Sequence, residues 1–363
     1  MKILHIHPSM AGGGCEAIIC SLANEMVKTQ DVSVCSIFKP KDTDVFWFKL
    51  NTDIKKYTLG KQNKGFSIKE IWAVYRLIKK EKFDIVYLHG FIQYYLLAVI
   101  LLCRRVKFCY TVHSDAFKEN VGWSKKLFKI KRFLFAHKWI VPITISNASQ
   151  NSFTNLYNCS SELIFNGVAK PKIKIEASEL IQKYRYTPKT KILIHPGRIT
   201  EAKNQLVLCK TIKHLIDDGE DVVLLIAGAN QDQQIFDSIE PYFNDRIVYL
   251  GERNDIPNLM SYSDALCLPS IWEGLPVVLL EALSVGCVPI CSPVGGIVDV
   301  VKSGVNGLLS ESSDENDFYN VMKKFISLSI EDVKDMQQRC LQSFELYDIT
   351  NTAREYIRVA SQK

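Results

Sequence analysis

The chain has 363 residues, 47% of them hydrophobic and 23% charged, which is ordinary for a soluble globular enzyme of about two domains. Its most apolar run, residues 91–103, is too short to span a bilayer and predicts a buried helix. Charge is uneven: residues 1–168 carry 24 Lys and Arg against 12 Asp and Glu, and residues 169–363 carry 21 against 27. No recognition motif accompanies the basic half, so nucleic acid is disfavoured, and an anionic surface or a solvated basic face remains.

Short apolar runs alternate along the chain with stretches of helical length. Continuous apolar runs, rather than alternating ones, are typical of parallel strands that are buried on both faces. Repeated β-α units of this kind predict two doubly wound, Rossmann-like α/β domains, which we expect to face each other across a cleft. The expected strands are residues 2–6, 32–38, 84–88, 106–112, 139–145 and 162–165, then 191–195, 222–227, 246–249, 265–268 and 288–291.

The boundary between the two domains is predicted near residues 168–172. Pro171 and Pro188 bracket a stretch with little apolar surface, which is typical of a linker. We therefore expect an N-terminal domain over 1–168 and a C-terminal domain over 169–345. Residues 346–363 read as a helix with no strand to follow, and are expected to cross back to the N-terminal domain.

Cysteine usage and the N-terminus both favour a cytoplasmic protein. The eleven cysteines are scattered without a C-x-x-C pair or an accompanying histidine cluster, so we expect reduced thiols and no metal site. The chain opens on a strand-like segment rather than on the charged, apolar and small-residue pattern of a secretory signal.

The first candidate motif is the glycine turn that follows the first strand. Gly12, Gly14 and Ala17 match the dinucleotide pattern G-x-G-x-x-G/A, in which backbone N–H groups approach a phosphate. Such a site also needs an acid at the end of the second strand, and that strand ends at Lys39. A nicotinamide cofactor is therefore disfavoured.

The second motif follows the first strand of the second domain. Gly197 permits a tight turn, and Arg198 and Lys203 are placed to reach one point above the carboxyl end of the strand. A forked donor and a point cation together suit a diphosphate, although two surface cations would give the same sequence.

The third motif places two carboxylates, Glu273 and Glu281, eight residues apart. Gly274 and Pro276 punctuate a loop before a helix, so Glu273 is expected in the loop and Glu281 within an otherwise apolar helix. A carboxylate at that second position can accept both hydroxyls of a ribose. The free N–H groups at the helix start can meet sugar or phosphate oxygens.

Together these motifs resemble the retaining glycosyltransferases of the GT-B fold, glycosyltransferase family 4, whose hallmark is E-x7-E. The resemblance covers nearly the whole chain. It is also carried by residues 164–168, 226–228, 250–257 and 292–296. It implies that a sugar moves from a UDP or GDP diphosphate donor to a glycan acceptor, with retention of configuration.

The resemblance assigns roles residue by residue. Arg198 and Lys203 would bind the diphosphate, Glu273 the donor sugar and Glu281 the ribose. Further donor contacts would come from Gly13, Gly14, Arg253, Asn254, Gly274, Leu275, Pro276 and Val277. His113 matches the family's histidine near the transferred sugar, although a strand-end histidine with an internal partner is the plainer interpretation. His89 is a candidate for the acceptor side because it occupies a similar strand end. Ser114 and Asp115 are further candidates: the family often has an acid directly after the His113 position, and this sequence departs from that pattern with Ser114 followed by Asp115.

The same residues predict chemistry without a metal or a cofactor. Arg198, Lys203 and nearby amides would stabilise the charge that develops on the leaving diphosphate, and no acidic D-x-D motif stands out. Retention implies same-face attack, with a phosphate oxygen taking the proton of the acceptor.

Residues 123–139 interleave lysines with large apolar side chains. Such a segment can lie on an anionic membrane, or it can be a packing helix with a wet basic face. The first alternative predicts a peripheral enzyme on the inner face of the cytoplasmic membrane. It would extend a lipid-linked precursor of a bacterial surface polysaccharide, such as capsule or lipopolysaccharide.

Three other functions fit the fold. A nucleotide-sugar epimerase would need acidic and histidine partners that cannot be assigned, and a phosphorylase would need a cofactor lysine on a longer chain. A non-catalytic glycan-binding or scaffold subunit is opposed by the intact set of Arg198, Lys203, Glu273 and Glu281.

Overall fold

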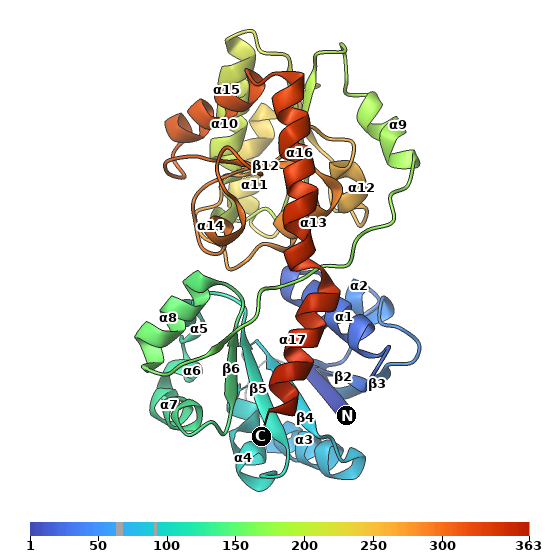
Figure 1. The fold of residues 1–363 in the computed structure, drawn as a ribbon, viewed down its shortest axis with the longest axis vertical. Coiled ribbons are helices and arrows are strands. Elements are labelled where there is room, and N and C mark those ends of the chain that lie inside the picture. Colours follow the sequence, from blue (N-terminus) through green and yellow to red (C-terminus); the bar gives the residue numbers. More distant parts are fainter. Residues whose placement is uncertain (63–67, 91–92, 363) are drawn as a thin grey trace. The chain divides into compact units, whose positions relative to one another are not determined.

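The structure is a computed structural model that describes residues 1–62, 68–90 and 93–362. The chain forms two compact units (Figure 1). The first combines Met1–Ala169 with Tyr347–Lys363, and the second is Lys170–Leu346. Each unit has its own sheet and core.

The first unit is built on a seven-stranded parallel sheet in the order β3-β2-β1-β4-β5-β6-β7. Apart from the outermost strand β7, this is the strand order of dinucleotide-binding α/β folds, which reverses between the first and fourth strands. The strands are β1 Lys2–His7, β2 Asp31–Phe38, β3 Lys55–Lys61, β4 Ile85–His89, β5 Lys107–Val112, β6 Val141–Thr144 and β7 Glu162–Leu163.

Helices cover both faces of this sheet, because its central strands are apolar on both sides. Leu4, Val86 and Phe108 pack on the face covered by α3, α4, α7 and α8, whereas Ile3, Tyr87 and Cys109 pack on the face covered by α1 and α17. The helices are α1 Gly14–Met26, α2 Val45–Phe48, α3 Ile68–Glu81, α4 Gln93–Leu102, α5 Ala116–Glu119, α6 Trp123–Lys126, α7 Phe128–Ala136, α8 Asn147–Tyr157 and α17 Ile349–Ser361.

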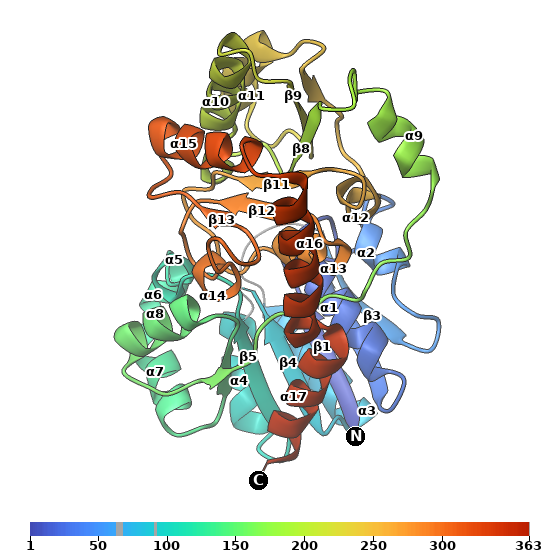
Figure 2. The ribbon, with the colours of Figure 1, turned by 45° about the horizontal axis from the view of Figure 1, so that its top comes forward.

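The C-terminal helix α17 belongs to the first unit and lies along its sheet (Figures 1 and 2). Tyr356 is fully buried there: its carbonyl oxygen accepts the Tyr87 hydroxyl at 2.6 Å, and its own hydroxyl lies 3.2 Å from the Thr111 hydroxyl. A side chain on Gly167 would collide with Thr352 at the start of α17, so glycine permits this close approach.

The second unit repeats the same strand order with six parallel strands, β10-β9-β8-β11-β12-β13. The strands are β8 Lys191–Pro196, β9 Val222–Ala227, β10 Ile247–Tyr249, β11 Ala265–Leu268, β12 Val288–Cys291 and β13 Leu308–Leu309. The helices are α9 Glu176–Gln182, α10 Gln205–Asp217, α11 Gln233–Ile239, α12 Ile256–Met260, α13 Val277–Val285, α14 Ile297–Val300, α15 Glu315–Ile326 and α16 Ile330–Phe344, with short 3-10 turns η1 Glu201–Lys203, η2 Glu240–Tyr242 and η3 Glu345–Tyr347, the last at the junction of the two units.

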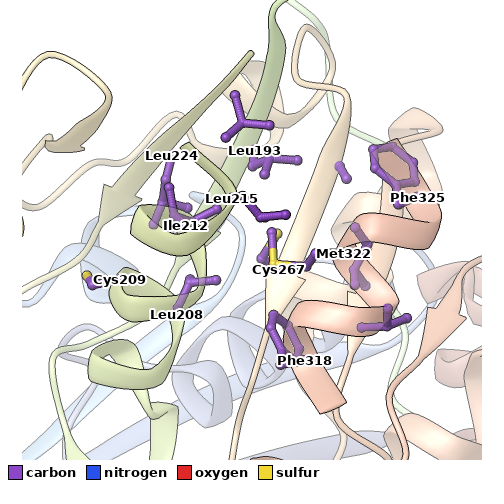
Figure 3. Packing of buried hydrophobic residues seen from close by; sticks show 14 of the residues in the cluster. Leu193, Leu208, Cys209, Ile212, Leu215, Leu224, Cys267, Phe318, Met322 and Phe325 are labelled. Atoms are coloured by element: carbon purple, nitrogen blue, oxygen red, sulfur yellow. The ribbon is translucent and has the colours of Figure 1, made fainter. Parts of the chain in front are cut away.

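Figure 3 shows the core on one face of this sheet. Apolar side chains of α10 and α15 gather against β8, β9 and β11, and Leu193, Ile212 and Phe318 are completely buried. The other face carries α12, α13 and α16, with α13 packed between its two neighbours. The opposite placement of α10 and α13 leaves the loops at the carboxyl ends of the strands free for a site.

The prediction of two parallel-sheet α/β units is confirmed, and the two strands that the sequence analysis missed are both at sheet edges. β3 has a lysine-rich sequence in which part-buried and exposed residues alternate, and β13 has only two residues. Neither has the continuous apolar run that marks a strand buried on both faces. All eleven cysteines are free thiols, and nine of them are buried.

The predicted buried helix at residues 91–103 is observed as α4, apart from residues 91–92, which lie outside the described residues. Val99 and Ile100 are buried, but Leu101 and Leu102 are more than half exposed, so the helix end is not a core segment. No helix in the described ranges combines the length and apolar character needed to cross a bilayer.

Candidate functional site

The two motifs of the second unit that carry opposite charges meet at the carboxyl edge of its sheet. Lys203 Nζ donates to Glu273 Oε1 at 2.6 Å, and the Ser270 hydroxyl donates to the same oxygen at 2.7 Å. The side chains of Lys203 and Glu273 are only 18% and 10% exposed. Residues 70 positions apart in sequence therefore form one part-buried ion pair, beside the strand end where ligands of this fold class bind.

Glycines in and beside the turn after β8 leave room for the Lys203 side chain. A side chain on Gly197 would lie 3.6 Å from the aliphatic stem of Lys203 and 3.3 Å from His195 Nε2. The backbone of Gly228, after β9, packs so closely that a Cβ there would overlap the carbonyl of Gly197. Asn204 fixes the end of the turn, since its amide donates to the Pro269 carbonyl at 3.1 Å.

Arg198 lies apart from that ion pair in the structure. Its side chain is exposed and donates to Gln231 Oε1 at 3.2 Å, while its carbonyl accepts the Gln205 amide at 2.9 Å. Arg198 and Lys203 therefore lie on the same loop, as predicted, but their side chains have different partners and do not meet at one point.

The E-x7-E segment spans the loop before α13 and the first turns of that helix. Pro276 caps α13 in an extended conformation, one position before the helix, and Leu275 is buried. Glu281, half-buried, lies in the second turn. Gly295 has φ +55°, and a Cβ there would overlap the carbonyl of Glu273, so the loop after β12 clamps the loop that carries Glu273.

The loop after β10 holds Arg253 by an internal ion pair. Its guanidinium donates to both carboxylate oxygens of Asp255, at 2.9 and 2.7 Å, whereas Asn254 is exposed. Because the Arg253 guanidinium is held in this way, the contact predicted for this loop would fall to its backbone.

Three histidines of the first unit form a hydrogen-bonded row at the carboxyl edge of its sheet. His5 Nδ1 lies 3.1 Å from His89 Nε2, and His89 Nδ1 lies 3.0 Å from His113 Nε2. Burial lowers the pKa of His5 and of His113 to about 3 and holds that of His89 well below its usual value, so all three are neutral at pH 7.

The row corrects the role that the sequence analysis gave to His89. His89 is completely buried, and both of its ring nitrogens face other histidines, so it is not placed to face an acceptor. His113 is half-buried, at the end of the row. His5 was missed because its place beside His89 depends on strand register, which no local pattern reveals.

The glycine turn after β1 has a carboxylate over it. Gly13 caps α1 in an extended conformation with φ −176°, and Glu16, the third residue of the helix, folds back so that Oε2 lies 2.5 Å from where a Gly13 Cβ would be. This is the position of the acid in a capping box. A phosphate approaching Gly13 and Gly14 would have to displace Glu16.

Asp115 and Ser114 are engaged locally. Asp115 Oδ1 accepts the backbone N–H groups of Phe117 and Lys118 and so caps α5. The Ser114 N–H donates to Glu119 Oε1 at 3.0 Å, and the Tyr110 hydroxyl donates to the same carboxylate. Burial raises the pKa of Glu119 to about 7. Glu119 is therefore a further acid beside the predicted acceptor loop, and an acid at the end of a short helix gives no sequence signal.

Residues 123–139 fold as two short helices with a mixed outer face. Ile130 and Phe133 are about half exposed beside the exposed Lys126 and Lys129. Lys131 is the buried exception and donates to Ser124 and Asn120.

A metal site would need at least three His, Cys, Asp or Glu side chains close together. Within residues 1–62, 68–90 and 93–362, no such group is found.

Family comparisons match both units of the chain. A model described as "Glycosyltransferase Family 4" matches residues 12–170, and one described as "Glycosyl transferases group 1" matches residues 176–341.

Individual relatives agree with those matches. An Escherichia coli UDP-Gal:alpha-D-GlcNAc-diphosphoundecaprenol alpha-1,3-galactosyltransferase is 31% identical over 268 residues, 70% of this chain and 69% of that protein. A Campylobacter jejuni alpha-1,4-N-acetyl-D-galactosaminyltransferase that acts on a diphosphoundecaprenol-linked glycan is 23% identical over 100% of this chain and 99% of its own. The Anabaena protein Alr3699/HepE, solved with UDP and glucose, has a TM-score of 0.84 and 18% identity, with each chain covered completely.

Proposed function

Since the chain belongs to glycosyltransferase family 4 and has its GT-B fold, we propose that it transfers a sugar from a UDP- or GDP-linked donor to a lipid-linked glycan, with retention of configuration. The observation that carries the donor half of this proposal is the Lys203–Glu273 pair, held at the carboxyl edge of a doubly wound sheet beside the N-terminus of α13.

The geometry supports donor binding through exchange of partners. Lys203 has three N–H donors, of which one reaches Glu273 Oε1, so the cation can hold the carboxylate and a diphosphate oxygen together. Glu273 held in this way is positioned toward the sugar carried by that diphosphate. Glu281, within α13, is the acid that would take the ribose hydroxyls.

The chemical step needs charge stabilisation on the leaving diphosphate. Lys203 and the N-terminus of α13 are donors already held beside that charge, and the exposed Arg198 side chain would turn toward it from the same loop when the donor binds. Such groups stabilise the transition state more than the ground state. We propose that they act without a metal ion, and that a leaving-group oxygen takes the proton of the acceptor hydroxyl.

Two relatives support a lipid-linked acceptor, because both are named for acting on diphosphoundecaprenol-linked sugars. The outer face of α6 and α7 supports a membrane contact, since it combines exposed lysines with Ile130 and Phe133. We therefore propose a cytoplasmic enzyme, peripheral on the inner face of the membrane, that builds a surface polysaccharide precursor of the capsule or lipopolysaccharide kind.

The first experiment measures donor binding and transfer separately. Thermal unfolding is followed with UDP, GDP and ADP and their common sugars in the presence of a chelator, because a ligand that binds only the folded state raises Tm. At 100 times its Kd, such a ligand adds about 2.7 kcal/mol. Glu281→Ala should lose most of that gain. Glu315→Ala, which removes a part-exposed acid of α15 paired with Lys210, should keep it.

Transfer is then measured with the stabilising nucleotide sugar and a synthetic lipid diphosphate carrying N-acetylglucosamine. The expected product is one sugar longer, and its linkage has the anomeric configuration of the donor by NMR. Nucleotide binding without transfer to any lipid-linked or free glycan would favour the scaffold function. A donor sugar converted to its epimer would favour the epimerase, and an inverted linkage would contradict retention.

A further inference from the structure

The three histidines of the first unit lie on one diagonal of the parallel sheet. Strand register places His5 opposite Tyr87, and His89 lies two residues further along β4. His89 is in turn opposite Thr111, and His113 lies two residues beyond it. Because side chains alternate between faces, the three rings share one face and step toward the carboxyl edge.

The rings are close enough to form a continuous chain of hydrogen bonds. Their centroids are 5.4 Å apart between His5 and His89 and 5.2 Å apart between His89 and His113, and the facing nitrogens are 3.1 and 3.0 Å apart. Each neutral imidazole has one N–H donor and one acceptor nitrogen. The chain can therefore run in two directions, and every ring must follow the same direction.

The inner end of the chain distinguishes the two directions. His5 is completely buried, and among the described residues its Nε2 has no hydrogen-bond partner. If His113 donated inward, His5 would carry its proton on this nitrogen as a buried N–H without an acceptor. If His5 donates outward, the same nitrogen is only a bare acceptor. Buried N–H groups without partners are the rarer of the two in folded proteins.

The outward direction determines the chemistry of the last ring. His5 Nδ1–H donates to His89 Nε2, His89 Nδ1–H donates to His113 Nε2, and His113 carries its proton on Nδ1. That nitrogen is on the edge of the ring away from His89, in a side chain that is only half-buried. The Nε2 lone pair is already used, so neither nitrogen of His113 is free to take a proton.

We propose that His5 and His89 are positioning residues that hold His113 as a neutral imidazole with its proton on Nδ1, directed at an oxygen of the bound substrate. His113 then acts as a hydrogen-bond donor to a sugar or phosphate oxygen and not as the base that deprotonates the acceptor. The identity of that substrate rests on the proposed function, whereas the proton position does not.

The deciding measurement is made on the free enzyme. In a ¹⁵N-histidine sample at pH 7.5, the two-bond ¹H–¹⁵N correlation pattern separates Nδ1–H from Nε2–H imidazoles, and His113→Phe assigns the signals of His113. We expect Nδ1–H for His5, His89 and His113. An Nε2–H pattern at His113, or a cationic ring, overturns the proposal.

Two substitutions at His5 test whether the inner histidine sets the outer one. In His5→Met a buried sulfur can accept but not donate, so the chain should reverse and His113 should show Nε2–H. In His5→Asn the amide nitrogen takes the place of Nδ1 and can still donate, so the wild-type pattern should remain. An unchanged His113 pattern in a folded His5→Met protein overturns the proposal.

Kinetics then separates positioning from a structural role. His5→Met should lower kcat about tenfold with little change in KM for the donor, in line with other residues that orient a functional group. The kcat of His5→Asn should stay within about twofold of the wild-type value, a much smaller change than the loss expected for His5→Met. On a His113→Phe background, His5→Met should cost nothing further, because the ring through which it acts is gone. Additive losses in the double variant would overturn the proposal.

The failure of this proposal can be told apart from failure of the proposed function. The tautomer is read without donor or acceptor, so an inactive protein still answers it. An active transferase with an Nε2–H signal at His113 would support the proposed function and contradict the proposed positioning of His113 by His5 and His89.

Discussion

The two units share a strand order but differ in what they place at the carboxyl edge of the sheet. The first unit presents a row of neutral histidines joined by side-chain hydrogen bonds, of which His5 and His89 are buried and His113 is half-buried. The second presents a part-buried pair of opposite charges on loops that touch through glycine backbones. The same strand order therefore supports two different sites. In the first unit the hydrogen-bonding character of the edge depends on which ring nitrogen carries a proton, and in the second it depends on charged side chains.

The largest expected difference between the two units is in acid: as the pH falls, the first unit should unfold before the second. Burial lowers the folded-state pKa of His5 and His113 to about 3 and that of His195, the buried histidine of β8, to about 4. Since these values lie below the unfolded value of 6.5, the unfolded chain binds the protons first. The stability that the neutral rings provide is complete above pH 6.5 and is lost as the pH falls toward 3.

The pH experiment follows amide hydrogen exchange by mass spectrometry between pH 8 and pH 4. Peptides from β1, β4 and β5 should lose protection at a higher pH than peptides from β8 and β11. Glu119 acts in the opposite sense. Because its pKa is raised to about 7, the folded protein binds its proton more tightly than the unfolded chain does, so its contribution to stability is complete below pH 4.5 and is lost as the pH rises through 7. Earlier opening of the second unit would show that the histidine row does not limit acid stability.

Removing the charge of the second edge should abolish most of the activity. In Lys203→Ala the leaving diphosphate loses a fixed cation, so kcat should fall by about 100- to 1,000-fold. Lys210→Ala is the matched control: it removes a part-exposed lysine of α10 that is paired with Glu315, and it should leave kcat unchanged. A Lys203→Ala enzyme with more than a third of wild-type kcat would remove Lys203 from the proposed mechanism.

The loops of the second edge should be sensitive to a single added methyl group. Gly295 has φ +55° and no room for a Cβ against Glu273, whereas Gly304 has φ +80° with open space around it. Gly304→Ala should cost about 1 kcal/mol, from backbone strain alone. Gly295→Ala should cost about 3 kcal/mol or more.

Chemical denaturation monitored on the second unit checks this pair. Equal losses in the two variants would mean that the loop after β12 yields without disturbing the Glu273 loop. A large loss for Gly295→Ala alone would show that backbone contact holds the charged edge together.

The charge contrast between the units gives an effect that is small for each single residue. Replacing Lys125, Lys126 and Lys129 by Gln should weaken binding to anionic vesicles by about 1 kcal/mol for each lysine. The matched control replaces Lys170, Lys172 and Lys174, which lie in the second unit and are also exposed. Sedimentation at low and high salt measures both, and no binding by the wild type at low salt would contradict the membrane contact.

The sequence was informative where one residue type has one structural use. Continuous apolar runs located the strands from β1 to β12 apart from β3, and the central ones gave the clearest signal because a strand covered on both faces has no polar side. Gly274 and Pro276 marked the loop before α13, because glycine suits a turn and proline suits the start of a helix, and Glu273 was placed in the loop as a result.

The rest of the site depends on contacts that no local pattern contains. The contact between Lys203 and Glu273 joins loops from β8 and β11, and the histidine row depends on the register of three strands. The Glu16 carboxylate over Gly13 is the instructive case: the glycines matched an anion-binding pattern, but an acid three residues later, at the third position of the helix, occupies the same place.

The return of α17 to the first unit has a consequence for the order of folding during synthesis. Tyr356 fills the space beside Tyr87 and Thr111, so the core of the first unit is incomplete until residues beyond the whole second unit have been made. At ordinary rates of translation this delay is on the order of tens of seconds. The second unit can meanwhile fold without waiting, so the unit that begins the chain is expected to be the last to become stable on the ribosome.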